Sequence, residues 1–432
     1  MIEVIWKYLT LADPNTRFVA IATLLLGGVS GVVGTFNFLR KKTLIGETVA
    51  HATLPGIVIG FMLFQIKNPA ILIIGAGLSG WLSITVVDHI TRTTKIKGDS
   101  ALAIVLSGFF GVGVLLLTVV QAYYPSEQSG LDHYIFGNAA AMTPVDGWTF
   151  GIVGVVVLLL VLAHYENLKS YIFNPEFTSS IGISAKRIDF IISTITILTI
   201  AIGIKAVGIV MMSALLIVPP TAARYWSNKM GVIVILSGVF GALGGYLGAF
   251  VSFASSKMPT GPWAIIVVTI IAFLSMMFSP KHGVMILKRR KRKLRERIEE
   301  ENILKCGVQL EVRGHGKLFR REDVCTRQYM SPKTWNPAIS RLHKNKLVER
   351  VYDRYTLTQE GRAYGVEIDR RHKIWEIYLQ RRMQLKVHYV HDEAETMEHF
   401  LTPEIERDIL DELKLCSRFN PLLEIHELVP QE

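Results

Sequence analysis

The sequence predicts an all-helical polytopic membrane bundle, followed by a cytoplasmic winged helix-turn-helix domain and a further helical region. Two observations lead to this prediction. Half of the 432 residues are apolar and only 19% are charged, against about a quarter in typical soluble chains. The apolar residues gather in long runs up to about residue 287, and the chain beyond is charged. A wholly soluble protein and a purely membrane protein are both excluded.

Charge and cysteine usage divide the chain further. Residues 288–297 (KRRKRKLRER) carry eight basic side chains and one acidic side chain, so this run supplies +7 of the formal net charge of +11. Cys306, Cys325 and Cys416 lie beyond the apolar part and form no CxxC pair, which excludes a disulfide framework and a zinc ribbon. The expected segments are a transmembrane domain (1–287), a basic juxtamembrane linker (288–299), a winged helix-turn-helix domain (300–365) and a helical region with a tail (366–432).

About nine runs in the apolar part are long enough to cross a membrane, which takes roughly 17–25 apolar residues. The candidates lie near 17–39, 52–66 (extended backwards to 43), 70–91, 100–121, 148–164, 188–204, 206–224, 231–253 and 263–280. The pair at 188–224 is crowded around Lys205 and Pro219–Pro220, so one of these two spans is expected to be short or re-entrant. Glycine-rich runs such as GALGGYLG at 241–248 let helices approach closely and predict a compact bundle.

The Lys and Arg residues of the short loops predict the orientation, because they favour the cytoplasmic side. With the N-terminus outside, the inner loops hold Arg40, Lys41, Lys42, Arg92, Lys95, Lys97, Lys169, Lys186, Arg187, Arg224 and Lys229. The outer loops then hold Lys7, Arg17, Lys67, Lys205 and Lys257. Eleven basic residues in the inner loops against five in the outer loops predict that the soluble region is cytoplasmic. The whole chain is then expected to be a multi-pass protein of the plasma (inner) membrane.

An ionisable pair interrupts the second apolar run, in LRKKTLIGETVAHATLPG at 39–56. Glu47 and His51 are four residues apart, so a helix presents them on one face, with a proline-glycine break expected just beyond. Ionisable groups within a span are costly and indicate a functional site. A carboxylate with an imidazole suits Mn²⁺, Fe²⁺ or Zn²⁺ better than Mg²⁺ or Ca²⁺. A helix-end pair that stabilises the bundle near the interface is the alternative.

Several further stretches, together with this one, resemble the membrane permease subunit of manganese/zinc/iron ABC importers (ABC-3 type). They are KGDSALAIVLSGFFGVGVLLL at 97–117, LDHYIFGN at 131–138, FNPEFTSSIGI at 173–183, VGIVMMSALLIVPPTAAR at 207–224 and PTGPWAIIVV at 259–268. The resemblance covers roughly residues 15–285 and implies that Glu47 and His51 bind the metal in transit. Family members usually have Asp at the positions of Glu47 and Asn174. The first difference keeps the ligand type but lengthens its reach.

The resemblance also implies that FNPEFTSSIGI holds a short coupling helix that docks on an ATPase subunit. The positions concerned are Asn174, Pro175, Glu176, Phe177 and Gly182. A proline early in such a helix is harmless, because its missing N–H would have no helical partner there. An ordinary amphipathic loop is the alternative interpretation of this stretch.

The chain lacks two enzyme signatures, so we expect it not to be an enzyme. It contains no GxxxxGK[ST] phosphate-binding loop, so ATP would be hydrolysed by a separate ABC ATPase subunit, and no HExxH of a metalloprotease. The resemblance implies two further partners, an extracytoplasmic metal-binding protein and a second permease subunit, as a homodimer or a paired permease. The basic run after the last span predicts contact with anionic membrane lipid. A nucleic-acid contact and a protease-sensitive hinge are the alternatives for that run.

The pattern of residues 322–365 predicts a helix-turn-helix with a wing. EDVCTRQYM (322–330) is expected to be one helix and SPKTWNPAISRLHKNKLVER (331–350) the next, with a Ser cap and an early Pro. A two-stranded wing follows. The second helix would enter the major groove of DNA. Its candidate DNA-binding residues are Lys333, Thr334, Asn336 and Arg341. Pro337 opposes a simple version, because an interior proline costs about 3 kcal/mol, so the helix is expected to be kinked or to start later.

Metal-ligand residue types recur at helical spacing between 372 and 399. His372 and Glu376 are i,i+4 in one predicted helix. Glu395, Glu398 and His399 are i,i+3,i+4 in another, with His391 just before. Two helices that each present carboxylate and imidazole can form an octahedral site for Mn²⁺ or Fe²⁺. A solvated charged face is the alternative.

Residues 300–415 resemble the iron- and manganese-dependent repressors of the diphtheria-toxin-repressor family, in AISRLHKNKLVER, YTLTQEGRAYG, RRHKIWEIYL and HDEAETMEHFL. The resemblance places His372, Glu395, Glu398 and His399 in a regulatory metal site and Glu376 and His391 in an ancillary one. It also implies that 366–432 serves metal binding and dimerisation. Asn302 and Lys305 stand where the manganese branch has acidic ligands, so the site is either incomplete or uses Cys306 or Glu301 as a substitute.

The sequence therefore predicts the permease subunit of an ATP-driven importer of Mn²⁺, Fe²⁺ or Zn²⁺ with a metal-responsive, repressor-like cytoplasmic domain. In one alternative, the C-terminal part is a metal-dependent DNA-binding transcriptional repressor, tethered or released by proteolysis near 288–300. In another, it only senses cytoplasmic metal and inhibits transport. The ligand types do not distinguish the three metals.

Overall fold

The computed structural model describes residues 14–65, 68–123, 137, 142–254, 259–314, 316–325, 330–383, 397, 399 and 401–413. The chain divides into two compact units, unit 1 (Met1–Leu287) and unit 2 (Lys288–Glu432). Each unit is described by itself.

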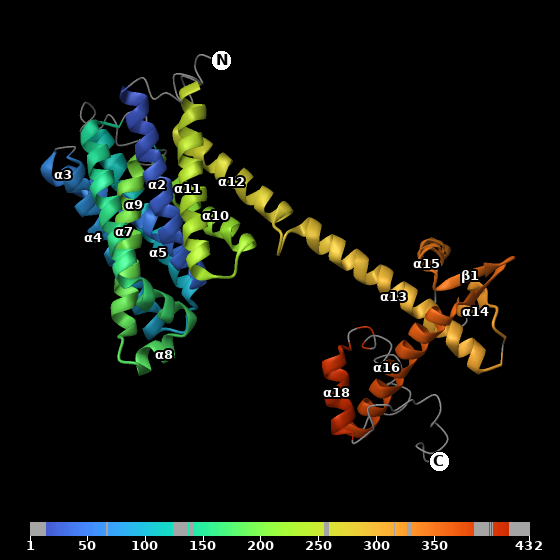
Figure 1. Cartoon of the computed structure of the whole chain (residues 1–432). Coiled ribbons are helices and arrows are strands. Elements are labelled where there is room, and N and C mark those ends of the chain that lie inside the picture. The colour runs from blue at the N-terminus through green and yellow to red at the C-terminus, as the bar shows by residue number, and fades with distance from the viewer. Residues whose placement is uncertain are drawn as a thin grey trace. The chain divides into compact units, whose positions relative to one another are not determined.

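Unit 1 is a bundle of helices (Figure 1). Its elements are α2 (Pro14–Leu39), α3 (Leu44–Phe64), α4 (Pro69–Thr93), α5 (Gly98–Tyr123), α7 (Pro144–Phe173), α8 (Pro175–Ser180), α9 (Ala185–Val207), α10 (Ile209–Trp226), α11 (Met230–Ala254) and α12 (Thr260–Phe278). Within the described residues, nine of these helices, all except α8, are long and apolar enough to cross a membrane. The predicted all-helical polytopic bundle is confirmed.

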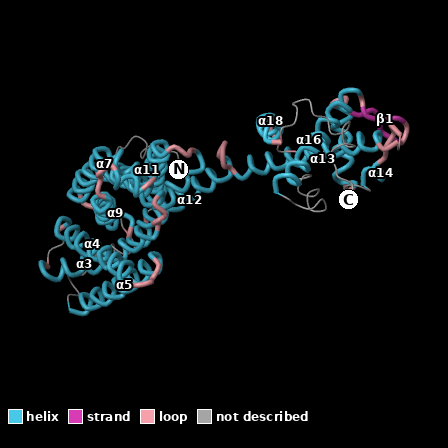
Figure 2. The backbone as a smooth tube through the Cα atoms, turned by 90° about the horizontal axis from the view of Figure 1, so that it is seen from below, coloured by secondary structure: helices cyan, strands magenta, loops and turns pink. Residues whose placement is uncertain are grey.

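The helices of unit 1 form two groups with α9 between them. Helix α3 packs against α4 and α5, and Figure 2 shows these three as neighbours. Helices α2, α10, α11 and α12 form the second group. Helix α9 packs against members of both groups and against α7. A displacement of α9 therefore bears on both groups at once.

Local chemistry fixes where these helices begin and end. The Asn68 side chain accepts a hydrogen bond from the Ala70 N–H at the start of α4, and Thr143 and Asp146 form a capping box at the start of α7. Gly208, with φ of 92°, turns the chain between α9 and α10. Helix α10 has 18 residues against 23 in α9, in line with the expected short span.

Glycines bring the helix backbones into contact. A Cβ atom at Gly27 of α2 would lie 2.1 Å from the carbonyl oxygen of Gly241 in α11, and one at Gly241 would lie 2.1 Å from that of Gly27. Gly56 of α3 and Gly75 of α4 meet in the same way, at 2.0 and 2.3 Å. Close backbone approach of this kind is how membrane helices pack without a hydrophobic drive between them.

Unit 2 combines helices with one β-hairpin. Helix α13 (Val284–Val312) contains the division between the units, and α14 (Arg321–Cys325), α15 (Pro332–Lys344), β1 (Val348–Val351), β2 (Arg354–Leu357), α16 (Gln359–Met383) and α18 (Pro403–Glu412) follow it. The strands are antiparallel, with Val348 opposite Leu357. A buried core around Leu304, Phe319, Trp335 and Leu342 joins α13, α15 and the hairpin. Helix, helix and hairpin appear in the predicted order.

Three local expectations need correction. The second helix of the helix-turn-helix ends at Lys344 instead of residue 350, because Asn345 caps it, Lys346 has a positive φ of 59°, and Val348–Val351 pairs as β1. That helix starts at Pro332 and contains Pro337, so it does not begin later. Pro55 does not break the helix that carries Glu47, since α3 continues to Phe64. Of the first helix, 321–325 is described, and 326–329 lie outside the described residues.

Candidate metal centres

Helix α3 carries the predicted transport ligands. Glu47 lies in its first turn and His51 one turn later, so both side chains belong to one face. Both are half-buried, in a helix whose other residues from Thr48 to Ile57 are buried. Nδ1 of His51 is buried and has no hydrogen-bond partner among the described residues. An imidazole nitrogen left in this state is available to a ligand.

The backbone carbonyl of His51 also lacks its usual hydrogen-bond donor within the helix. An α-helix bonds each carbonyl to the N–H four residues later, and four residues after His51 stands Pro55, which has no N–H. Pro55 remains inside the helix because neighbouring helices support it. Gly56 contacts α4 through its backbone, and the Ser79 hydroxyl donates to the Ala52 carbonyl at 2.5 Å. Among the described residues, His51 thus presents an Nδ1 without a hydrogen-bond partner and a carbonyl that lacks its usual helical N–H donor.

Helix α5 closes over the same region of α3. The His51 imidazole meets the Phe110 ring edge-on, with 4.8 Å between the centroids. The Thr48 hydroxyl donates to the carbonyl of Leu102 at 3.4 Å. Aromatic packing fixes the plane of the imidazole, and no hydrogen bond from the residues that the structure describes competes for Nδ1. The arrangement can hold a cation by an imidazole nitrogen and a nearby carboxylate.

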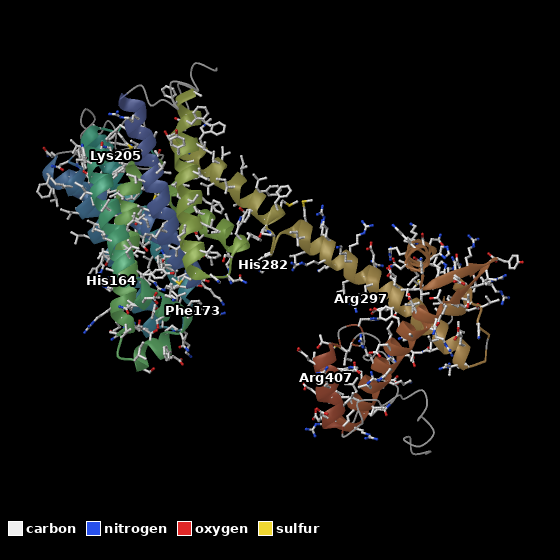
Figure 3. All side chains as sticks on the ribbon, in the orientation of Figure 1. His164, Phe173, Lys205, His282, Arg297 and Arg407 are labelled. Carbon is white, nitrogen blue, oxygen red and sulfur yellow. The ribbon has the colours of Figure 1, made fainter. Side chains whose placement is uncertain are left out.

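The predicted coupling segment forms α8, a six-residue helix at one end of unit 1 (Figure 1). Figure 3 shows Phe173, just before α8, and Lys205 near opposite ends of unit 1. Asn174 caps α8, because its side-chain oxygen accepts from the Phe177 N–H at 2.9 Å, so asparagine makes the helix-start contact in place of aspartate. Glu176 and Phe177 are exposed, and Gly182 ends the segment with φ of 85°.

In unit 2, the described part of the predicted metal region contains two donor clusters. The first is on α16. Nε2 of the fully buried His372 lies 3.0 Å from Oε1 of Glu376, and Lys373 Nζ donates to Oε2 at 2.8 Å. Burial opposes ionisation of Glu376, but the hydrogen bonds from His372 and Lys373 outweigh it and hold its pKa well below the usual range. Glu376 is therefore a carboxylate at neutral pH.

The second cluster joins α13 to His399. Nδ1 of His399 lies 2.6 Å from Oε2 of Glu301, and its Nε2 lies 3.1 Å from the side-chain oxygen of Asn302. Arg297 and Tyr364 each donate to the other oxygen of Glu301 at 2.6 Å. Burial opposes ionisation of Glu301, but the hydrogen bonds from His399, Tyr364 and Arg297 lower its pKa to about 2. Glu301, one of the proposed substitutes, thus contacts His399, as Asn302 does.

The donors of these clusters are imidazole, carboxylate and amide, a set that fits Mn²⁺ or Fe²⁺ by type. Among the described residues, no group of three or more His, Cys, Asp or Glu side chains is placed to hold a metal ion. His391, Glu395 and Glu398 lie outside the described residues. Arg297 already compensates the charge of Glu301, which opposes a metal bound there. Lys305, four residues further along the same helix, is buried.

The candidate DNA-binding residues of α15 differ in their surroundings. Lys333 and Asn336 are exposed. The Thr334 hydroxyl donates to the carbonyl of Ser331 at 2.9 Å. Arg341 forms an ion pair with Glu300 of α13, which holds it against the body of unit 2. Two of the four side chains are thus free to reach a partner.

Two polar contacts in unit 1 involve residues that sequence reasoning did not assign a function. Asp189 of α9 pairs with Arg40 and accepts a hydrogen bond from Tyr171. At the other end, Lys205 Nζ lies 2.6 Å from Oδ2 of the fully buried Asp146. An ionisable residue at the edge of a span is the signal that could have found both contacts.

Comparison with known protein families decides the identity of unit 1. Residues 12–279, more than half of the chain, match the ABC 3 transport family. The chain belongs to the ABC 3 transport family. Residues 358–419 match the family described as iron dependent repressor, metal binding and dimerisation domain. This ABC 3 permease is therefore a multi-pass membrane transport protein with a repressor-type domain at its C-terminal side, as the sequence predicts.

Two curated relatives of this permease carry metal-transport names. It is 33% identical over 386 residues to the manganese transport system membrane protein MntC of Bacillus subtilis, covering 89% of this chain and 88% of the relative. It is 40% identical over 283 residues to the zinc transport system membrane protein TroC of Treponema pallidum, covering 66% of this chain and 95% of the relative. The first match includes part of unit 2, because unit 1 makes up 287 of the 432 residues.

A solved structure shares the fold of the membrane part. PsaBC from Streptococcus pneumoniae in complex with Fab contains a chain that is 27% identical to this permease and superimposes with a TM-score of 0.59. The similarity covers 67% of this permease and 100% of that chain. The extent of the match agrees with the share of the chain that forms unit 1.

Proposed function

We propose that this permease moves Mn²⁺, Fe²⁺ or Zn²⁺ across the membrane past Glu47 and His51. The observation that carries the proposal is His51, whose buried Nδ1 has no hydrogen-bond partner in the described part of the chain, while Pro55 supplies no helical N–H to its carbonyl. Glu47 adds a carboxylate one turn away. A transported ion needs ligands that both bind it and release it. An acceptor without a hydrogen-bond partner can bind the ion without first breaking another bond. The manganese and zinc names of the relatives support a divalent transition metal as the substrate.

The energy source would be a separate ABC ATPase subunit that docks on α8. Phe177, with 56% of its surface exposed, and Glu176 are available to it on a capped helix. The Lys and Arg count of the loops supports a cytoplasmic position for α8 and an outside N-terminus. An extracytoplasmic metal-binding protein would deliver the ion to the opposite end, and a second permease subunit would complete the pathway. The exposed basic residues of α13 would contact anionic lipid.

The test is metal uptake by the permease reconstituted with its ATPase subunit in proteoliposomes. Radiolabelled Mn²⁺ and Zn²⁺ are offered in parallel. His51→Ala and Glu47→Gln are expected to lower uptake about a hundredfold, because two to three kcal/mol of ligation is lost. The matched controls are His164→Ala and Glu166→Gln, a histidine and an exposed glutamate of α7, which should retain uptake. Equal uptake in both pairs of variants would refute the proposed site.

For unit 2, the proposed function is metal sensing through His372, Glu376 and His399, completed by His391, Glu395 and Glu398. Exposed Lys333 and Asn336 beside a hairpin wing favour DNA binding as a second candidate function. Binding of unit 2 to DNA upstream of metal-transport genes, measured against salt, separates the two. Metal-dependent binding with a steep salt slope supports a repressor. Metal binding without DNA binding supports a sensor that acts on transport.

A further inference from the structure

Three polar side chains from three spans meet at the α8 end of unit 1. Arg40 follows α2, Tyr171 lies near the end of α7 and Asp189 lies near the start of α9. One carboxylate oxygen of Asp189 forms an ion pair with the Arg40 guanidinium, and the other accepts from the Tyr171 hydroxyl at 2.9 Å. The same guanidinium lies over the Tyr171 ring, 5.5 Å from its centroid. The three side chains therefore form a closed triangle.

The two charged side chains of the triangle differ in how far they are buried. The Arg40 side chain is 6% exposed, whereas that of Asp189 is 42% exposed. A guanidinium this buried is costly without a counter-charge, and Asp189 is its carboxylate partner among the described residues. A second polar link joins the same two helices, because Asn37 Nδ2 donates to the Thr196 hydroxyl at 2.9 Å. Asp189 thus fixes Arg40, and the two links fix α2 against α9.

The three residues of the triangle lie close in sequence to two segments with proposed functions. Helix α8 lies between Tyr171 and Asp189 in sequence, and a 3.0 Å hydrogen bond between the hydroxyls of Ser170 and Thr178 joins it to α7. Four residues after Arg40 the chain enters α3, the helix of the metal ligands. The triangle is therefore adjacent in sequence both to the docking helix and to the ligand-bearing span.

We propose that Asp189 is a positioning residue for energy coupling. Through Arg40 and Tyr171 it holds the ends of α2, α7 and α9 together, so that a displacement of α8 by the ATPase subunit reaches the start of α3. Helix α9 is suited to this role because it packs against both helix groups of unit 1. The proposal rests on the transport function proposed above and adds the connection within the chain. Asp189 touches neither the metal nor the ATPase subunit in this role.

The experiment measures ATP hydrolysis and radiolabelled Mn²⁺ uptake by the full permease, reconstituted with its ATPase subunit in proteoliposomes. Asp189→Asn keeps the shape and removes the charge, and Tyr171→Phe removes only the hydroxyl. Uptake per ATP is expected to fall about tenfold in the first and about threefold in the second, with hydrolysis retained. Arg40→Glu combined with Asp189→Arg restores an ion pair and should recover about half of the lost coupling. Glu166→Gln, which breaks an exposed pair with Lys169 on α7, should behave as wild type.

Two results would overturn the inference. The first is a wild-type ratio of uptake to hydrolysis in Asp189→Asn. The second is a parallel loss of uptake, hydrolysis and assembled complex that the charge swap does not reverse, since that marks a purely structural residue. Failure of the proposed metal site is distinguishable from both. His51→Ala would then retain uptake, whereas the coupling ratio of Asp189→Asn is read in a chain with both ligands intact.

Discussion

His399 and Glu301 lie 2.6 Å apart, Nδ1 to Oε2, and Arg297 holds the other oxygen of the same carboxylate. A metal that binds His399 in unit 2 must therefore compete with a cation for Glu301. The resemblance to the diphtheria-toxin-repressor family implies that its manganese-type members have acidic ligands at the positions of Asn302 and Lys305. The neutral amide and the buried ammonium make this half of the site less anionic than in those relatives. Weak metal binding is the expected consequence.

Removal of Arg297 should strengthen metal binding by unit 2. Arg297→Gln removes the positive charge and one of the two donors at Oε1 of Glu301, while Tyr364 stays bound there. Mn²⁺ affinity is expected to rise about threefold to tenfold, a modest gain because the Arg297 side chain is more than half exposed. His399→Ala should abolish the heat of Mn²⁺ binding in calorimetry of residues 288–432. Arg292→Gln is the matched control, since it breaks an exposed i,i+4 pair with Glu296 on the same helix. Weaker binding in Arg297→Gln would contradict competition for Glu301.

The sequence predicted the types of donor in unit 2 but could not predict this competition. Helical spacing identifies His372 with Glu376 because both lie on α16. Glu301 and His399 are 98 residues apart, and only the packing of α13 brings them together. Whether the ligands act as proposed remains a prediction, because His391, Glu395 and Glu398 lie outside the described residues.

Arg341 and Lys333 should behave differently if unit 2 binds DNA. Lys333 is exposed on α15, so Lys333→Gln should weaken binding to all sequences and reduce the salt slope by about one. Arg341 is paired with Glu300, so Arg341→Gln should destabilise unit 2 by about 1 kcal/mol and leave the salt slope unchanged. Thermal unfolding and DNA titrations at several salt concentrations give both quantities. A lower salt slope in Arg341→Gln would mean that Arg341 leaves Glu300 to contact phosphate.

Helix α8 should lose its docking function without its cap. Asn174→Ala removes the side-chain acceptor for the Phe177 N–H, a loss of about 1 kcal/mol in a helix of six residues. The variant should retain less ATPase subunit on purification. Glu176→Lys reverses the charge of the same surface and should lower uptake and ATPase association together. Lys169→Gln, an exposed change on α7, is the control for both. Full association in Asn174→Ala and Glu176→Lys would place the docking surface elsewhere.

Apolar runs predicted the spans of unit 1 closely, because the bilayer sets their length. The run at 70–91 became α4 (Pro69–Thr93), and the differences at its ends come from the Asn68 cap and a polar last turn. The run at 148–164 became α7 (Pro144–Phe173), which continues through Glu166 and Lys169 because a helix does not end where its apolar residues end. The contact between Arg40 and Asp189 could not be predicted, since 149 residues separate them.

The proline after His51 should matter for transport more than for folding. Pro55→Ala supplies an N–H that bonds the His51 carbonyl, so α3 should gain stability while the carbonyl is lost to a passing ion. Uptake is expected to fall about threefold to tenfold at equal protein, with a raised unfolding temperature in detergent. Pro219→Ala is the matched control, because it restores the same kind of bond inside α10, to Leu215. Equal uptake in the two proline variants would show that the His51 carbonyl has no part in the path and would leave its imidazole, with Glu47, as the only ligands there.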